Sequence, residues 1–223
     1  MKDLTKLDQL ANQDMELPDK KPLNLAETVE NNIIESDYSR SEKPFNLFSP
    51  SQIGYCKRQM YNRKMNITDM DRYIQGILHA GTVNHFWLEH NLPELAESRG
   101  LETERKFRKE IEVPDENFNI YIHGFADVVD SEGYVYDHKF TGAPKYKSDK
   151  PAEKDKRQVM MYIYCLDDAK VGRLEYNKRD GKFEKGDDNT YYHSVFYENN
   201  TMNDMMEIMT DVAKRVKKRK GKV

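Results

Sequence analysis

Cysteine is scarce in this sequence, and long apolar runs are missing from it. Its 223 residues include only two cysteines, Cys56 and Cys165, which lie far apart. Two thiols cannot form a disulfide framework, a four-thiolate metal site or a four-cysteine iron–sulfur site within one chain. No apolar run approaches the roughly 20 residues that span a bilayer, and the N-terminus lacks the apolar core of a secretory signal. We therefore expect a cytoplasmic protein with no membrane partner.

The composition is polar but still supports a packed interior. Charged residues make up 34% of the chain and the mean hydropathy is −0.94, whereas hydrophobic residues make up 37% and aromatic residues 11%. Disordered chains have far fewer apolar and aromatic residues at this level of charge. The length suits one domain with a sizeable core and short extensions.

The net charge of −3 conceals two basic segments. A C-terminal cluster without acidic residues carries seven positive charges, so the rest of the chain sums to about −10; its members are Lys214, Arg215, Lys217, Lys218, Arg219, Lys220 and Lys222. A second cationic segment covers residues 145–157. Local basic patches on an acidic chain favour contact with phosphates at particular places. For the C-terminal cluster, a solvated tail is an equal alternative.

The N-terminal part of the chain has a helical pattern. Residues 1–44 are polar and acidic and predict an arm or a small helical cap, and residues 45–223 predict one domain with a basic tail at 214–223. Ser49, Pro50 and Gln52 are typical of a helix start, and we expect that helix to continue to Tyr61. A longer helical region is predicted over residues 70–99.

After Gly100 the sequence pattern becomes typical of strands. Aromatic and β-branched residues predict strands over residues 106–113, 118–129, 133–140, 171–178 and 191–197, with turns at 130–133 and 179–182. Helices are predicted over residues 155–168 and from about residue 202, the last anchored by Met202, Met205, Met206 and Met209. Helices followed by a small sheet with a crossing helix predict an α/β or α+β fold.

The informative chemistry lies on the predicted hairpin. A three-residue turn at 131–133 places Asp127 opposite Asp137, with Lys139 on the same face. Two opposed carboxylates in apolar strands repel unless a cation or a proton lies between them. Carboxylate oxygens suit Mg²⁺ or Mn²⁺ rather than Zn²⁺, and such an ion activates water beside a phosphate while Lys139 orients it. The pattern indicates a phosphodiesterase; the alternative is a salt-bridged hairpin with two surface aspartates.

Two further pairs accompany the hairpin. His85 and Glu89 lie one turn apart on the predicted long helix, so the imidazole is either a structural histidine or an additional metal ligand. Gln158 and Tyr162 share one face of the next helix, which is otherwise an ordinary amphipathic helix.

The cationic segment that begins with Lys145 and Lys147 joins the hairpin to the helix that carries Gln158. We expect it to overhang any site on the hairpin and to meet a phosphate backbone there.

Four motifs in chain order resemble those of the RecB-type PD-(D/E)XK nucleases: Gly81-x-x-x-His85, Gly124-Phe-Ala-Asp127, Asp137-His-Lys139 and Gln158-x-x-x-Tyr162. The segment Tyr55-Cys-Lys-Arg-Gln-Met-Tyr61 is similar to the N-terminal helix of the CRISPR-associated RecB-like exonucleases. Those proteins ligate a 4Fe-4S cluster through one cysteine there and three more near the C-terminus. Only Cys56 matches, so we expect no iron–sulfur cluster, as in the phage, viral or mitochondrial single-domain exonucleases of the family.

The resemblance implies a restriction-endonuclease-like core with a mixed central β-sheet flanked by helices and an N-terminal helical region. It also implies a role for each site residue. The metal ligands would be Asp127, Asp137, the carbonyl of His138, and His85, with Glu89 as a further candidate. Lys139 would position the water. The residues that support Lys139 or contact DNA would be Gln158, Tyr162, Arg58, Lys145 and Lys147.

The expected function is a Mg²⁺- or Mn²⁺-dependent DNA exonuclease acting on single strands or duplex ends in replication, recombination or repair, in a bacterial, archaeal or phage-infected cell. An endonuclease is one alternative. Another is a DNA-binding or adaptor protein that keeps the scaffold without turnover and docks a protein partner through residues 1–44. A zinc hydrolase using His85, Glu89 and His90 would leave the strand at residues 137–139 unexplained.

Overall fold

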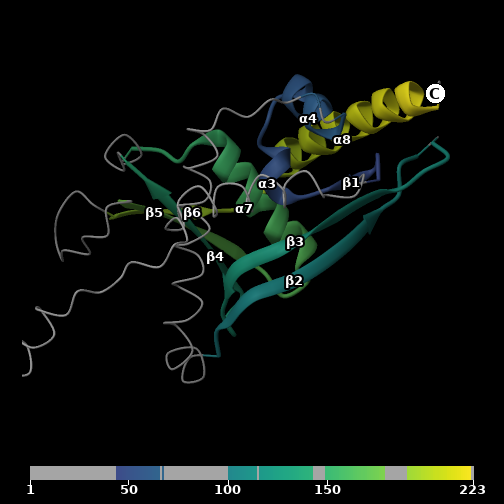
Figure 1. Cartoon of the computed structure of the whole chain (residues 1–223). Coiled ribbons are helices and arrows are strands. Elements are labelled where there is room, and N and C mark those ends of the chain that lie inside the picture. Colours follow the sequence, from purple (N-terminus) through teal and green to yellow (C-terminus); the bar gives the residue numbers. More distant parts are fainter. Residues whose placement is uncertain are drawn as a thin grey trace, which may run out of the picture. The chain divides into compact units, whose positions relative to one another are not determined.

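The computed structural model describes residues 44–65, 67, 100–114, 116–142, 149–178 and 190–221, all within one compact unit, Lys43–Val223 (Figure 1). The predicted arm, apart from its last residue, lies outside this part of the chain. So do the predicted helix at residues 70–99 and the predicted turn at 179–182.

The described part of the chain contains both strands and helices. In chain order they are β1 (Leu47–Phe48), α3 (Pro50–Ile53), α4 (Lys57–Lys64), β2 (Glu102–Ile111), β3 (Ile120–Val129), β4 (Tyr134–Thr141), α7 (Glu153–Cys165), β5 (Val171–Lys178), β6 (Thr190–Val195) and α8 (Asn199–Lys220). Each strand and helix predicted after residue 100 is present, with ends shifted by a few residues. The predicted mixed α/β fold is confirmed.

The six strands form one mixed sheet. The path runs β1-β3-β4-β5-β6, and β2 pairs with β3. The β1–β3 and β4–β5 pairs are parallel and the others are antiparallel. Helix α7 supplies the crossover that the parallel β4–β5 pair requires.

Strands β3 and β4 stay together over a short stretch only. Their ladder pairs Val128 with Tyr136 and Val129 with Val135, whereas β4 pairs with β5 along its whole length. Near the start of β3, Tyr121 and Ile122 pair with β1 instead. The two strands therefore diverge at Asp127, and we call this position the fork.

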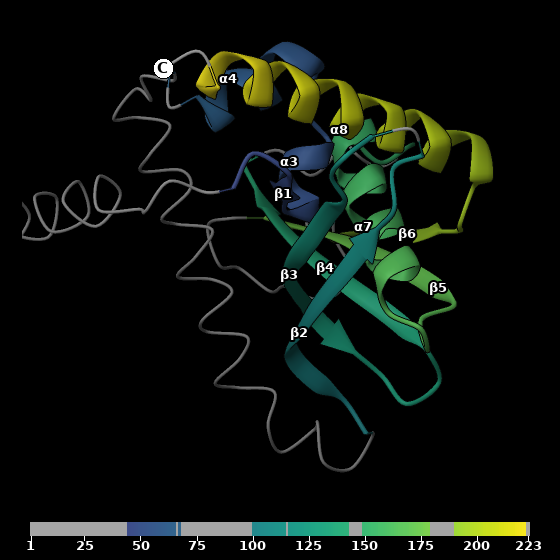
Figure 2. The ribbon, with the colours of Figure 1, turned by 90° about the vertical axis from the view of Figure 1, so that its right-hand side faces the viewer.

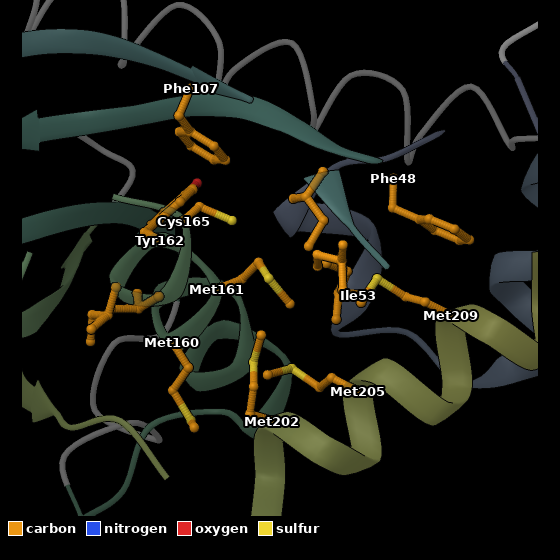
Figure 3. Close-up of a cluster of buried hydrophobic side chains, with 14 of the residues drawn as sticks. Phe48, Ile53, Phe107, Met160, Met161, Tyr162, Cys165, Met202, Met205 and Met209 are labelled. Atoms are coloured by element: carbon orange, nitrogen blue, oxygen red, sulfur yellow. The ribbon is translucent and has the colours of Figure 1, made fainter. Parts of the chain in front are cut away.

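The core lies between the sheet and helices α7 and α8. Helix α7 presses closely on β5, because a Cβ at Gly172 would lie 2.0 Å from Val159 Cγ1. Figure 3 shows Met202 and Met205 of α8 near Met160 and Met161 of α7, and Met209 beside Ile53 of α3. All of these side chains are buried. The predicted anchoring of the last helix by methionines is confirmed.

The helix predicted from Ser49 to Tyr61 is wrong in its length. It begins as expected, with Gln52 Oε1 accepting a hydrogen bond from the Ser49 N–H (3.3 Å). It ends at Ile53, and α4 begins separately at Lys57. The break allows a close contact, because a Cβ at Gly54 would lie 2.6 Å from the carbonyl oxygen of Lys154 in α7.

The C-terminal basic cluster belongs to a packed helix over residues 214–220, so its description as a tail is wrong there. Val216 is buried, Lys214 pairs with Glu116 (2.6 Å), and Lys217 lies 5.0 Å from the ring centre of Phe118. Cations also suit the C-terminal end of a helix dipole. Neither α8 nor another described helix combines the length and hydropathy of a membrane span.

Candidate active site

Asp137 and Lys139 meet inside the protein on the face of β4 that α7 covers. The Asp137 side chain is fully buried, and Lys139 Nζ lies 3.0 Å from its Oδ1 and 2.8 Å from its Oδ2. Alternation along the strand puts both residues on one face. The alternative of two surface aspartates on a salt-bridged hairpin is therefore wrong for Asp137.

Helix α7 brings Gln158 and Tyr162 onto this pair. The Gln158 amide donates to Asp137 Oδ1 (3.0 Å) and to the Tyr162 hydroxyl (2.6 Å), and its carbonyl accepts from Lys139 Nζ (3.1 Å). The i, i+4 spacing read from the sequence is what aligns the two side chains. Gln158 thus connects the acid and the ammonium of β4 to the helix.

Asp127 lies at the fork. The predicted register holds for the two pairs before it, but Asp127 and Asp137 do not form the next pair of the ladder. The Asp127 carboxylate instead accepts a hydrogen bond from the backbone N–H of His138 (2.9 Å). A side chain therefore replaces the backbone bond where the strands separate, which puts the carboxylate beside Asp137.

Burial and charge set the ionisation of this cluster. Burial raises the pKa of Asp137 to about 7; the Lys139 ammonium opposes this shift, and the Asp127 charge adds to it. Burial lowers the pKa of Lys139, but the carboxylates of Asp137 and Asp127 outweigh it, so that pKa is raised overall. Burial and the same two carboxylates also raise the pKa of Tyr162. Lys139 is accordingly a cation at neutral pH.

His138 points its imidazole away from Asp137. Its Nδ1 lies 3.1 Å from Glu175 Oε2 on β5. Burial alone would lower the pKa of His138, but the bond and the charge of Glu175 outweigh burial and raise it. Only the backbone of His138 is therefore placed to serve the site.

Two acidic residues near the cluster were missed in the sequence. Glu104 on β2 lies between Thr103 and Arg105, which pair with Val128 and Ala126 of β3. It has φ of 48°, and its charge contributes to the raised pKa of Tyr162. Positive φ is uncommon for a residue other than glycine and often occurs at functional sites. Nothing in the charged run around Glu104 distinguishes it by sequence.

The second missed residue is Asp155, which is buried in the first turn of α7. It accepts a hydrogen bond from the Tyr176 hydroxyl (2.7 Å), which in turn accepts one from the Ala152 N–H (3.0 Å). An acid in the first turn of a predicted helix is a weak signal, and its burial depends on β5.

The other predicted site residues fall into two groups. His85, Glu89, Lys145 and Lys147 lie outside the described residues, as does His90. Arg58 is exposed on α4, a helix that packs on α8.

The end of the cationic segment is helical, in agreement with the helix predicted from residue 155. Lys156 and Arg157 lie in α7 and pair with Glu198 (2.7 Å) and Glu153 (3.1 Å). These ion pairs reduce the positive charge that this segment can offer to a phosphate.

The cysteines lie in different environments. Cys56 is exposed at the start of α4, and Cys165 is buried in α7. Burial raises the pKa of the Cys165 thiol to about 12. Because a thiol ligates metals as the thiolate, we assign no metal-binding role to Cys165.

The carboxylates of Asp127 and Asp137 are the candidate ligands for a divalent cation. Within the described ranges, no three His, Cys, Asp or Glu side chains converge as a metal-binding group. Asp137 Oδ2 is nevertheless buried and receives only the ion pair with Lys139 Nζ (2.8 Å) from the described residues, and Asp127 adds a second set of hard oxygen donors. This donor set fits Mg²⁺ or Mn²⁺, with further ligands required from the backbone or from outside the described residues.

Comparisons with known proteins relate the chain to solved structures only. No protein-family model matches the sequence, and no curated protein matches it significantly. The crystal structure of SSO0001 has a TM-score of 0.61 at 20% identity and covers 84% of each chain. The two proteins therefore share a fold.

Two exonucleases are more distantly similar. The alkaline exonuclease LHK-Exo from Laribacter hongkongensis has a TM-score of 0.49 at 9% identity, over 78% of this chain and 90% of its own. A phage-related exonuclease from Haemophilus somnus 129PT has a TM-score of 0.46 at 14% identity, over 74% and 81%.

Proposed function

We propose that this protein is a metal-dependent DNA nuclease, and specifically an exonuclease acting on single strands or duplex ends. One observation carries the proposal: a buried Asp137 in contact with Lys139, both held by Gln158, beside the Asp127 carboxylate at the fork. A fully buried carboxylate beside a second carboxylate is a costly arrangement for a structural ion pair alone. The order of the four motifs supports the same interpretation.

Each residue of the cluster would have a distinct role in phosphodiester hydrolysis. Asp127 and Asp137 would hold Mg²⁺ or Mn²⁺, with the His138 carbonyl and His85 as further ligands, and the bound ion would activate water beside the scissile phosphate. Lys139 would orient that water and stabilise negative charge on the phosphoryl oxygens. Gln158 fixes the ammonium by accepting its hydrogen bond.

DNA is the proposed substrate, since the motifs resemble those of DNA nucleases. A cytoplasmic location and the docking of a protein partner through residues 1–44 are also proposals, which come from the sequence alone.

The test uses end-labelled linear and circular single-stranded DNA with Mg²⁺ or Mn²⁺. We expect Asp137→Asn and Lys139→Ala to lower the cleavage rate by at least about 100-fold, because each removes a group that stabilises developing charge. Lys170→Ala, which changes an exposed lysine outside the cationic segment, is the matched control. Variants that cleave like the wild type would refute the site assignment.

Two further results refine the assignment. Circular DNA cut as fast as linear DNA would identify an endonuclease. Thermal stabilisation by Mg²⁺ that disappears in Asp127→Ala, together with no cleavage by the wild type, would identify a metal-binding protein without turnover.

A further inference from the structure

The β2–β3 ribbon has two chemically different faces. One face packs into the core, as Figure 3 shows for Phe107 pointing toward Tyr162; its buried residues include Phe107, Ile111, Ile120, Ile122 and Ala126. The other face carries cationic residues on β2 and aromatic rings on β3. We call it the outer face and define it by Lys106, Arg108, His123 and Phe125. Figure 2 shows the two strands side by side with α7 behind them.

The register sets the outer face in two cross-strand pairs. Lys106 lies opposite Phe125, and Arg108 lies opposite His123. The rings of His123 and Phe125 meet edge to face, with centres 5.8 Å apart. Each pair therefore presents a cation beside an aromatic ring.

These side chains are available to a partner. Phe125 is 47% exposed, and Lys106 and Arg108 are exposed. Neither cation has a salt-bridge partner among the described residues, although the Arg108 guanidinium lies 5.0 Å from the ring centre of Tyr121. The outer face therefore offers an exposed apolar ring beside two exposed cations.

One end of the outer face lies close to the Asp127 carboxylate at the fork. Asp127 follows Phe125 by two residues on β3, a repeat of about 7 Å along a strand. At the end of the outer face that lies away from Asp127, the charge changes from positive to negative at Glu110. Its carboxylate accepts hydrogen bonds from Asn119 (2.6 Å) and Tyr121 (2.9 Å). These bonds lower the pKa of Glu110, so the cationic part ends there.

We propose that the outer face binds the single strand next to the scissile phosphate, with Phe125 and His123 stacking on bases and Lys106 and Arg108 meeting phosphates. This inference rests on the proposed nuclease function. Stacking needs unpaired bases, because a duplex presents phosphates and groove edges rather than base faces. The outer face therefore selects single-stranded ends.

The test measures binding separately from cleavage. Fluorescence anisotropy of a labelled oligothymidylate is recorded in EDTA, which prevents metal-dependent cleavage. We expect Phe125→Ala to weaken binding about tenfold and to have little effect on an abasic strand of equal length. We expect Lys106→Ala/Arg108→Ala to weaken the binding of the normal strand and of the abasic strand. The slope of log K against log salt concentration should become less steep by about 1.4.

Matched controls remove the same chemistry elsewhere. Phe196→Ala removes a ring that is 60% exposed, and Lys170→Ala removes an exposed charge before β5. Both controls should bind like the wild type. Since all these side chains are exposed, thermal unfolding should show that each variant is folded.

The outcomes separate this inference from the proposed function. If Phe125→Ala binds like the wild type, or weakens duplex binding equally, the inference is wrong even where Asp137→Asn abolishes cleavage. If the wild type does not cleave DNA but the outer-face variants alone lose single-strand binding, the inference holds and the nuclease function fails.

Discussion

The contact between Lys139 and Asp137 is unusual because the carboxylate is fully buried beside a second carboxylate. Removing a carboxylate and an ammonium from water is expensive, and their mutual attraction repays the cost only with good hydrogen bonds around them. Gln158 bonds to both groups, and Lys139 Nζ lies within 3.0 Å of both Asp137 oxygens, but the nearby Asp127 charge disfavours the ionised form of Asp137. The arrangement is therefore better suited to binding a cation than to stability alone.

Gln158 should be a positioning residue for cleavage. In Gln158→Ala the Lys139 ammonium loses one acceptor and the Asp137 carboxylate loses one donor. We expect kcat to fall about 10- to 100-fold, as for residues that orient metal ligands, with a smaller change in KM. Arg157→Ala, one residue away in an exposed ion pair, is the control. An unchanged kcat in Gln158→Ala would contradict this role.

The raised pKa of Asp137 should make the metal-free protein less stable as pH rises. Burial raises this pKa from 3.8 to about 7, so between these values the folded protein holds a proton that the unfolded chain has released. Its contribution to the free energy of unfolding is present below about pH 4 and is lost towards pH 7, by up to about 1.4 kcal/mol per pH unit. Urea unfolding in EDTA across this range measures it.

Asp137→Asn isolates this contribution because the amide does not titrate. The variant should lose less stability than the wild type between pH 4 and 7, and added Mg²⁺ should restore stability at neutral pH in the wild type only. Parallel curves for the two proteins would show that Asp137 titrates at an ordinary pKa.

At the level of elements, two glycines let helices approach the sheet. A Cβ at Gly124 would lie 2.9 Å from Pro50 Cδ and 3.1 Å from Phe107 Cζ, so the glycine of the Gly124-Phe-Ala-Asp127 motif makes room for α3. Gly172 does the same for α7. A glycine in a nuclease-like motif can thus serve packing rather than chemistry.

Gly172→Ala should displace α7 from β5. The added methyl group would meet Val159 Cγ1 at 2.0 Å, and such overpacking costs about 1–3 kcal/mol. Because α7 carries Gln158, cleavage should slow as well. Gly142→Ala is the control, since a Cβ there has nothing within 4 Å. Equal unfolding midpoints in urea for the two variants would refute the tight contact.

At the scale of the whole molecule, α8 joins parts of the chain that are far apart. Its buried methionines pack into the common core, and Lys57 of α4 lies 3.4 Å from Asp211 of α8. Exposed ion pairs of this kind contribute little. The apolar contacts therefore hold α8 in place.

Met205→Ala should cost about 2–5 kcal/mol of unfolding free energy, because it leaves a cavity at a fully buried position. Met205→Leu nearly conserves the volume and should cost less than about 1.5 kcal/mol. Met206→Ala, at a partly buried neighbour, should fall between zero and the loss in Met205→Ala. Equal losses for Met205→Ala and Met206→Ala in denaturant titrations would contradict this packing.

Local patterns in the sequence were enough to predict most elements. Alternation and turn residues predicted the hairpin and the register of the two pairs next to its turn, because both depend on neighbours in the chain. The helix from Ser49 was predicted too long, because Cys56 is extended (φ −68°, ψ 157°) and a second helix begins after it. Asp155 of α7 was missed, because its hydrogen bond comes from Tyr176 on β5, which is distant in the sequence.

The sequence by itself determined which residues are available for chemistry and in what order: Asp127, Asp137 and Lys139 around one turn, then Gln158 and Tyr162 one helical turn apart. Only the tertiary structure decided that Asp137 is buried, that Asp127 binds the His138 backbone at the fork, and that Gln158 reaches both Asp137 and Lys139. The physical reason is that burial and ionisation depend on what distant elements place around a group, whereas spacing depends on the chain alone.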